Sequence, residues 1–300
     1  MTSAVRIYDA FSGHEVKSFS FSGGERQVRL PDSLTQLHNK IVILARITSP
    51  GDILDLLLTV DALKRRFKSF DRIEKTLYLP YLPYSRQDRV CANGEALSIS
   101  VFAKLINSLN FTSVVTFDCH SDVGTALIEN CINIPQEEII LEWLQPESEL
   151  TEPFLTVIAP DSGASKKAFK TWQGLNPYTR NSSFIQANKE RNPNTGEIVD
   201  ITIPTAVGVA TGTHLVVDDL CDGGRTFIEL AKNFWKRDSS SLLYVTHGIF
   251  SNGFVELLNY YDKIYCTDTF SSYSPATHHG GRVIQFNVVE RYIEKEFNCA

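Results

Sequence analysis

One run of the sequence, His214–Phe227, combines residue types that could bind a sugar phosphate. An apolar stretch ends in two adjacent carboxylates, then turns through two glycines into a cation, a hydroxyl and a helical pattern; these residues are Asp218, Asp219, Asp222, Gly223, Gly224, Arg225 and Thr226. Carboxylates at a strand end can accept hydrogen bonds from vicinal hydroxyls. Glycines let main-chain N–H groups surround a phosphate at a helix N-terminus. The run therefore predicts a site for a phosphorylated ribose.

The same run has a plainer interpretation, because an Asp-Gly-Gly sequence also suits an ordinary loop. The adjacent pair Asp218 and Asp219 argues against it. Carboxylates beside a buried strand cost free energy unless they are compensated. The pair therefore favours a binding role.

A second polar segment, Tyr81–Arg89, follows an apolar run and a proline. It carries two arginines, a glutamine and an acid, namely Arg86, Gln87, Asp88 and Arg89. Guanidinium and amide groups offer forked donors for a phosphate or a purine edge. On composition alone a solvated loop fits equally well, so both interpretations stay open.

Two single residues, His120 and Asp161, follow apolar runs in the two halves of the chain. A histidine at the end of a strand is most often a hydrogen-bonded structural residue. Together the two could hold Mg²⁺, which prefers oxygen ligands and retains several waters.

A polar segment with proline and glycine, Asn188–Glu197, separates two β-like runs and predicts a hairpin. Its cations are Lys189 and Arg191. A charged hairpin tip can simply be solvated, but a lid of this kind can also exclude water and deliver cations during phosphoryl transfer.

The elements that must position these residues alternate between short β-branched runs and amphipathic helical ones, which indicates an α/β fold with mostly parallel sheets. The predicted strands are Lys40–Ile47, Thr76–Tyr81, Ser113–His120, Phe154–Asp161, Ser182–Lys189, His214–Leu220, Leu242–His247 and Lys263–Phe270, with a short strand at Val5–Tyr8. The predicted helices are Ile53–Phe67, Leu97–Leu109, Ser165–Trp172, Thr226–Lys236 and Phe254–Tyr261. In such sheets, ligands bind beyond the carboxyl ends of the strands.

The length of 300 residues suggests two domains. Around Gln145–Pro153 the composition turns polar and acidic, so we expect domains at residues 1–148 and 149–300. The segment Val114–Gly124 faintly echoes the His214–Phe227 pattern of strand, acid, turn and helix, which favours two similar domains.

Bulk composition limits the function classes. The net charge of -6 and the scattered Lys and Arg residues argue against a nucleic-acid partner. Six separated cysteines without a Cys-x-x-Cys pair argue against a zinc knuckle or a disulfide scaffold. No run reaches the ~20 apolar residues of a membrane span, and no signal-peptide pattern opens the chain. We expect a cytoplasmic protein with no membrane partner.

Several segments resemble ribose-phosphate pyrophosphokinases, also called PRPP synthetases, of the type I phosphoribosyltransferase superfamily. Pro83–Asp88 is similar to the family's Pro-Tyr-Ala-Arg-Gln-Asp, and His214–Phe227 is similar to its ribose-phosphate loop. The other similar segments are Phe21–Glu25, Val60–Arg65, Thr116–His120, Ala159–Gly163 and Thr246–Ser251, in the family's order. The resemblance spans about residues 20 to 270.

The resemblance implies two phosphoribosyltransferase-like domains, an N-terminal one on the ATP side and a C-terminal one on the ribose-phosphate side. It also allows residues 282–300 to pack back on the first domain. It implies ATP contacts from Phe21, Gly23, Glu25, Arg86, Gln87, Asp88 and His120, Mg²⁺ held beside His120 and Asp161, and catalytic cations at Lys189 and Arg191. The seven residues of the glycine-containing run would bind the ribose phosphate.

The activity implied is an ATP-dependent diphosphokinase reaction, in which the β,γ-diphosphoryl group of ATP moves to the 1-hydroxyl of ribose 5-phosphate and yields PRPP and AMP. In the family, the segment matching Phe21–Glu25 reaches a neighbouring subunit's ATP site. We therefore expect a homodimer or higher homo-oligomer.

Three departures from the family pattern bear on these expectations. The turn reads Asp222-Gly223-Gly224-Arg225-Thr226 where the family has Asp-Thr-(Ala/Gly)-Gly-Thr. This difference leaves room for a 5-substituted acceptor such as ADP-ribose, which would place the enzyme in NAD synthesis or salvage. Ser121–Ala126 replaces a segment tied to regulation by ADP and phosphate, and the N-terminal opening also differs. Allosteric control and hexamer formation are therefore not assumed.

Two other classes compete with this interpretation. A phosphoribosyltransferase would use the same sugar loop but consume PRPP. A non-catalytic subunit associated with PRPP synthetases would be expected to lose the lid cations, yet Lys189 and Arg191 are both present.

Overall fold

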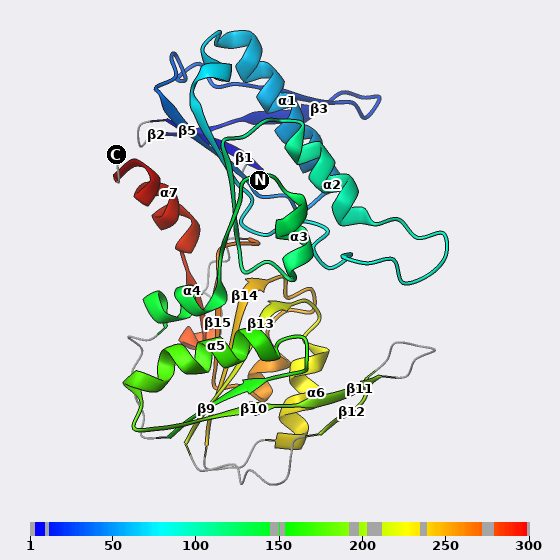
Figure 1. Cartoon of the computed structure of the whole chain (residues 1–300), viewed down its shortest axis with the longest axis vertical. Helices are drawn as coiled ribbons and strands as arrows, with labels where there is room; N and C mark the ends of the chain where they lie inside the picture. The colour runs from blue at the N-terminus through cyan, green and yellow to red at the C-terminus, as the bar shows by residue number, and fades with distance from the viewer. Residues whose placement is uncertain are drawn as a thin grey trace. The chain divides into compact units, whose positions relative to one another are not determined.

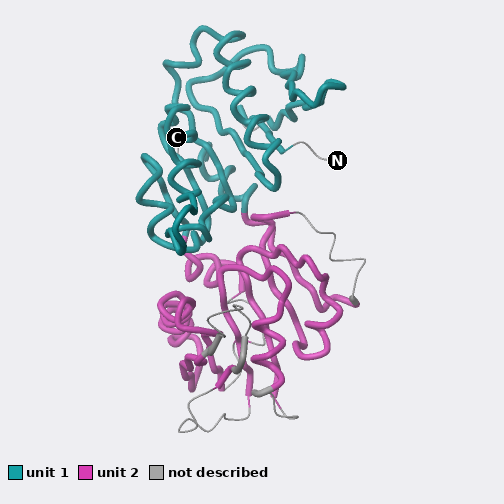
Figure 2. The backbone as a smooth tube through the Cα atoms, turned by 90° about the vertical axis from the view of Figure 1, so that its right-hand side faces the viewer, with its two compact units in different colours: residues 1–134, 289–300 teal, residues 135–288 magenta. Residues whose placement is uncertain are grey.

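The alternation of apolar strands and amphipathic helices builds two α/β units, which confirms the predicted fold class (Figure 1). The structure is a computed structural model. It describes residues 4–9, 12–144, 150, 154–191, 198–202, 212–234, 239–271 and 279–298. Unit 1 comprises residues 1–134 and 289–300, and unit 2 comprises residues 135–288 (Figure 2). Each unit contains a six-stranded sheet.

The sheet of unit 1 has the order β2-β1-β5-β6-β7-β8. These strands are β1 (Val5–Asp9), β2 (Ser12–Glu15), β5 (Lys40–Ala45), β6 (Glu74–Tyr78), β7 (Ser113–Phe117) and β8 (Cys131–Ile134). From β5 to β8 the strands are parallel, whereas β1 pairs antiparallel with both of its neighbours. Consecutive strands thus lie side by side, so right-handed crossovers place their connecting helices on one face.

Those connecting helices are α1 (Pro50–Arg66), α2 (Ser98–Asn107) and α3 (Asp122–Leu127). Alternate residues of β5, Ile41 and Ile43, belong to one buried cluster with Leu56 of α1 and Phe102 of α2. This cluster is the main core of unit 1, and it fixes the strand ends from which the polar loops emerge.

The opposite face of the sheet carries the C-terminal helix α7 (Val288–Asn298). Successive strand residues point to opposite faces, so Tyr78 faces away from the cluster that holds Leu77. Tyr292 of α7 packs edge-on against Phe117, with ring centroids 5.3 Å apart, and its carbonyl accepts a hydrogen bond from Tyr78. The end of the chain therefore completes unit 1.

A separate hairpin carries the Phe21–Glu25 segment. Its strands, β3 (Lys17–Ser20) and β4 (Arg26–Arg29), pair with each other in a two-stranded sheet. Gly24 at the turn has φ +93°, a conformation that glycine adopts without strain. In Figure 1 the hairpin extends beside α1.

The sheet of unit 2 is parallel throughout, in the order β10-β9-β13-β14-β15-β16. Its strands are β9 (Phe154–Ala159), β10 (Asn181–Gln186), β13 (Thr213–Cys221), β14 (Ser240–Gly248), β15 (Lys263–Thr267) and β16 (Val283–Phe286). The helices are α4 (Gln136–Trp143), α5 (Ser165–Leu175) and α6 (Arg225–Phe234), and β11 (Asn188–Arg191) pairs with β12 (Ile198–Thr202).

The strand order of unit 2 changes direction at β9. The chain leaves β9 through α5 to β10 on one side, whereas β13 lies on the other side of β9. A crevice forms at such a switch point, beyond the carboxyl ends of the two central strands. Asp161 follows β9 and Asp218 lies near the end of β13, so the topology places both carboxylates at this end of the sheet.

The eight longer strands predicted from apolar runs are all present, and so is the short strand at Val5. The predicted helix Phe254–Tyr261 is wrong, because only a 3₁₀ turn, Leu257–Asn259, forms there. Upstream, Phe250 and Gly253 have positive φ values of 47° and 73°, so the chain folds back on itself before a helix can begin.

The division between the units differs from the expected boundary at residue 148. Unit 2 already begins at Pro135. Helix α4 accounts for the difference, because Lys170 of α5 donates to Glu137 at 3.1 Å and Trp143 packs against Phe286. The polar composition around Gln145–Pro153 therefore follows this helix in the sequence and lies ten residues after the start of unit 2.

Candidate functional site

Three carboxylates, Asp161, Asp218 and Asp219, interact at the switch point of unit 2; we call them the carboxylate cluster. The main-chain N–H of Asp219 donates to Asp218 Oδ1 at 2.8 Å, and Lys167 Nζ lies 3.5 Å from Asp219 Oδ2. Burial, followed by the neighbouring charges of Asp219 and Asp161, raises the pKa of Asp218 well above its usual range. Such a cluster favours partners that donate hydrogen bonds or carry positive charge.

Asp161 also has a local structural task. Its Oδ1 accepts hydrogen bonds from the main-chain N–H groups of Gly163 and Ala164, at 2.9 and 3.1 Å. These bonds organise the turn that leads into α5. Lys167, in the first turn of that helix, is thereby brought to Asp219.

The turn Asp222–Gly224, which we call the glycine turn, is hydrogen-bonded to the segment that follows β14. Ser251 Oγ donates to Asp222 Oδ1 at 2.8 Å, and Asn252 Nδ2 donates to the Gly223 carbonyl at 3.2 Å. Gly224 has φ +80°, and a Cβ there would approach the Leu257 side chain to 3.2 Å. Glycine is therefore required at position 224 by both conformation and space.

The glycine turn leaves hydrogen-bond donors available at the start of α6. Within the described ranges, the main-chain N–H groups of Gly223, Gly224 and Arg225 donate to no recorded acceptor. Unpaired donors at a helix N-terminus suit an anion, because the helix dipole adds to their positive potential. Asp218 and Asp219 of the cluster lie in β13, which leads directly into these donors.

Four contacting residues were not predicted from the sequence. Gln136 of α4 donates to the Asp218 carbonyl at 2.6 Å, while Lys167, Ser251 and Asn252 contact the cluster and the turn. Ser251 lay inside a segment already noted for its resemblance, which was the available signal. The others are remote in sequence from the residues that they hold.

In unit 1 the structure brings the Tyr81–Arg89 loop to the residues after β7. Arg89 donates to Asp88 at 2.9 Å. This bond, together with the neighbouring Ser121 and His120, lowers the pKa of Asp88. His120, Arg86 and Gln87 are exposed.

The remaining predicted residues are distributed over other elements. Phe21, Gly23 and Glu25 form the tip of the β3–β4 hairpin, where Phe21 is 55% exposed. Lys189 and Arg191 lie in β11, opposite Ile201 and Ile198 of β12. Their side chains lie outside the described residues, as do residues 192–197.

The predicted site is therefore divided between the units. The sugar-phosphate residues and Asp161 belong to unit 2, whereas His120 and the other predicted ATP contacts belong to unit 1. The pairing of His120 with Asp161 around a metal joins residues of different units and stays a prediction.

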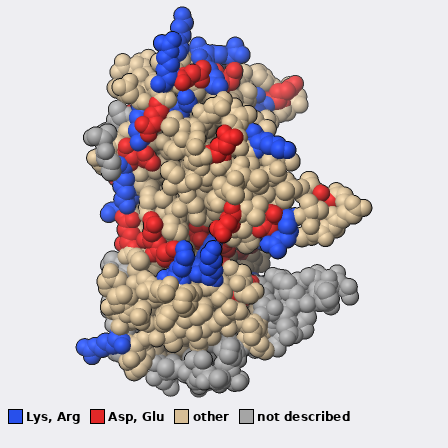
Figure 3. Space-filling model, in the orientation of Figure 1, with Lys and Arg blue, Asp and Glu red and all other residues tan. Residues whose placement is uncertain are grey.

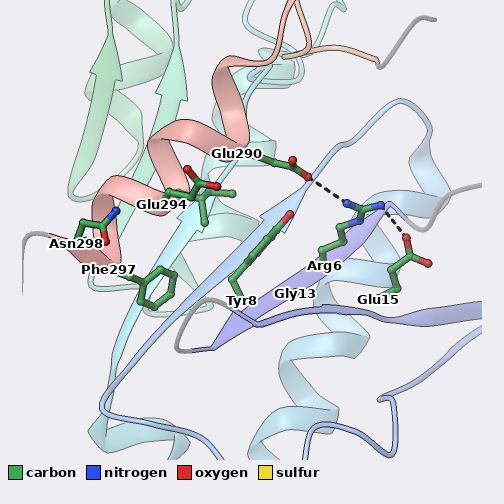
Figure 4. Close-up of a pocket in the computed structure, with 9 residues that line it drawn as sticks. Arg6, Tyr8, Gly13, Glu15, Glu290, Glu294, Phe297 and Asn298 are labelled. Atoms are coloured by element: carbon green, nitrogen blue, oxygen red, sulfur yellow. Dashed lines mark hydrogen bonds and ion pairs between the residues drawn. The ribbon is translucent and has the colours of Figure 1, made fainter.

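A cavity of about 540 Å³ in unit 1 lies apart from these residues (Figure 4). Its walls come from β1, β2 and α7. Arg6 bridges Glu15 at 2.8 Å and Glu290 at 3.4 Å, which fastens α7 to the edge of the sheet. These ion pairs join α7 to β1 and β2 on the wall of the cavity.

The charge pattern and the helices add two general observations. On the face shown in Figure 3, Lys and Arg residues are interspersed with Asp and Glu, in keeping with the scattered charges of the sequence. Among the helices within the described ranges, none is long and apolar enough to cross a membrane.

Comparisons with known proteins agree with the motifs. Residues 4–109 match the family model for the N-terminal domain of ribose phosphate pyrophosphokinase. The ribose-phosphate pyrophosphokinase of Aquifex aeolicus is 27% identical over 265 residues, covering 85% of this chain and 78% of the relative. That of Mycoplasma genitalium is 28% identical over 277 residues, covering 90% and 78%.

The fold has a solved counterpart in phosphoribosylpyrophosphate synthetase from Mycobacterium smegmatis. The TM-score is 0.75 at 20% sequence identity, covering 96% of this chain and 91% of that one. Both α/β units are thus shared with that structure. The family model, the relatives and the fold therefore agree on a distant relationship to the ribose-phosphate pyrophosphokinase family.

Proposed function

We propose that this protein is an ATP-dependent diphosphokinase that transfers the β,γ-diphosphoryl group of ATP to the anomeric hydroxyl of ribose 5-phosphate. The hydroxyl oxygen attacks the β-phosphorus, the bond between that phosphorus and the oxygen shared with the α-phosphate breaks, and AMP leaves. The hydroxyl proton is lost to solvent or buffer. The products are PRPP and AMP.

One observation carries the proposal: Asp218 and Asp219 in β13 are followed directly by the open main-chain donors of Gly223, Gly224 and Arg225 at the start of α6. Asp218 and Asp219 would accept hydrogen bonds from ribose hydroxyls. The N–H groups of Gly223, Gly224 and Arg225 would bind the 5-phosphate, with the Thr226 hydroxyl beside them. The family relationship supports the same assignment.

The other predicted residues would bind the second substrate, ATP, and would compensate the negative charge of the transferring group. Arg86, Gln87 and Asp88 would contact ATP, and so would the hairpin tip Phe21–Glu25, reaching across a subunit boundary in a homodimer or larger homo-oligomer. Lys189 and Arg191 would stabilise the transferring group. Phosphoryl transfer depends mainly on such alignment and charge stabilisation.

A divalent cation fits this donor set. Within the described part of the chain, no group of three or more His, Cys, Asp or Glu residues could hold a metal by itself. Mg²⁺ does not need one, because it usually binds through one or two carboxylates, waters and substrate phosphates. Asp161 and His120 would hold it, and when bound it would neutralise phosphate charge.

A 5-substituted ribose such as ADP-ribose is a second candidate acceptor. Gly223 stands where the family has a threonine, and Arg225 is an exposed cation at the start of α6. The missing side chain gives room and the guanidinium could pair with a further phosphate. The product would then be the pyrophosphate of ADP-ribose.

Incubation with ATP, Mg²⁺ and each acceptor separately tests the proposal. We expect AMP release with ribose 5-phosphate, and the ratio of AMP release between the two acceptors identifies the preferred one. The double substitution Lys189→Ala with Arg191→Ala should abolish AMP release. Failure to release AMP with either acceptor would refute a diphosphokinase, and PRPP consumption without ATP would identify a phosphoribosyltransferase.

A further inference from the structure

The β3–β4 hairpin is attached to unit 1 by the buried side chain of Val28, which belongs to the unit 1 core, and by the side chain of Arg26. Among the described strands, β3 and β4 pair only with each other, so no ladder of the six-stranded sheet fixes their direction. The tip is aromatic and exposed, with Phe21 packed edge-on against Phe19 at 5.5 Å. The hairpin therefore needs another device to hold its tip in place.

Arg26, the first residue of β4, connects three elements. Its Nε donates to Asp55 Oδ1 of α1 at 3.0 Å, and its Nη2 donates to Asp55 Oδ2. The same guanidinium donates to Ser20 and Ser18 of β3, at 3.4 and 3.3 Å. A planar guanidinium with several donors fixes direction as well as distance.

Asp55 is unusual for a helical carboxylate, because its side chain is only 2% exposed. A buried carboxylate is costly unless it is paired. Buried ion pairs of this kind can often be replaced by apolar side chains without loss of stability, which leaves conformational specificity as a reason to keep one.

We infer that the Arg26–Asp55 pair is a positioning device that holds the Phe21–Glu25 tip in the orientation needed to contact ATP. The inference rests on the proposed function of that tip. Arg26 adjoins Glu25 directly, so a change in the direction of its side chain is transmitted to the ATP-contacting residues. Neither Arg26 nor Asp55 is assigned a contact with substrate.

The double substitution Arg26→Met with Asp55→Leu separates positioning from stability. We expect the double variant to melt near the wild-type temperature, because no charge is left buried and unpaired. The KM for ATP should nevertheless rise roughly 10- to 100-fold, the scale of a small misplacement of binding groups. The kcat at saturating ATP and the KM for the acceptor should change little. Amide hydrogen exchange at residues 21–25 should become faster.

A matched control is the pair Arg65–Asp61 on the same helix, where Arg65 Nε donates to Asp61 Oδ2 at 2.7 Å at the surface. Arg65→Met with Asp61→Leu should leave the KM for ATP and the exchange unchanged.

Two results would overturn the inference: a wild-type KM for ATP with wild-type exchange in the Arg26/Asp55 double variant, or a loss of stability as large as that of Arg26→Met alone. If wild-type protein releases no AMP, the proposed function fails, while hydrogen exchange still tests the positioning of the tip.

Discussion

At the scale of single residues, the carboxylate cluster stores unfavourable electrostatic energy in the free protein. Asp218 is flanked by Asp219 and Asp161, and its raised pKa is the sign of that cost. Binding sites commonly keep such groups because the ligand compensates them and folding does not. Asp218 is therefore expected to trade stability for ligand binding.

We predict that Asp218→Asn raises the stability of the free protein by on the order of 1–3 kcal/mol near neutral pH. A carboxyl whose pKa is higher in the folded than in the unfolded state binds its proton more tightly when folded. The free energy of unfolding therefore falls as the pH rises from the unfolded-state pKa to the folded-state pKa. The advantage of the asparagine should thus be small near pH 4 and grow toward pH 8. Thermal melts across pH check this.

The same substitution should weaken acceptor binding, which isothermal titration measures. Asp71→Asn, which alters an exposed carboxylate of unit 1, should change neither property. A stability gain from Asp218→Asn that does not depend on pH would contradict the electrostatic explanation.

A second residue-scale prediction concerns Gly224. Gly224→Ala should destabilise unit 2 by more than the ~1–2 kcal/mol of a left-handed alanine, because its Cβ would also press on Leu257. Gly253→Ala is the control, since Gly253 has φ +73° with nothing within 4 Å. Urea denaturation of both variants measures the difference, and equal losses would show that the Leu257 contact is unimportant.

At the scale of elements, α7 was not among the helices predicted from the sequence, although the resemblance allowed residues 282–300 to pack on the first domain. It belongs to unit 1 although β16, which precedes it, belongs to unit 2. Lys40 donates to Glu296 at 2.7 Å, Tyr78 donates to the same carboxylate at 3.0 Å, and Tyr292 covers Phe117. The helix closes the sheet face that α1, α2 and α3 leave open.

We predict that Tyr292→Ala costs about 3 kcal/mol of stability, because an aromatic side chain is removed from a packed contact. Lys295→Ala removes a cation that lies 4.2 Å from the same ring and should cost well under 1 kcal/mol. Denaturant unfolding of both variants provides the comparison. A loss below 1 kcal/mol for Tyr292→Ala would mean that α7 is not needed to seal this face.

At the scale of the whole molecule, the chain crosses between the units twice, after Ile134 and after Val288. The proposed acceptor residues nevertheless belong entirely to unit 2. Acceptor binding should therefore not require the proposed ATP contacts of unit 1.

We predict that ribose 5-phosphate alone, without ATP or Mg²⁺, raises the melting temperature of the protein. A ligand at a hundred times its Kd stabilises the folded state by about 2.7 kcal/mol. Free ribose and inorganic phosphate should each give a smaller shift, because each contacts only half of the site. No shift with ribose 5-phosphate until ATP is added would place part of the acceptor site in unit 1.

The sequence alone determined the order of the chemistry along the chain. The adjacent Asp218 and Asp219, the glycine turn and the β-branched runs are local patterns, so the α/β class and the predicted strands could be read from spacing. The family's motifs were recognisable for the same reason. Local spacing failed where the chain folds back, as at Phe250–Tyr261.

Only the tertiary structure decided which distant residues meet. Asp161 interacts with Asp218 because β9 and β13 are neighbours at a change of strand order, and Gln136 and Ser251 reach the site from other connections. Arg26 finds Asp55 in the same way. Strand order, crossover handedness and burial select these pairs from the many that the same composition would allow. None of these three factors produces a periodic pattern that could be read from the sequence.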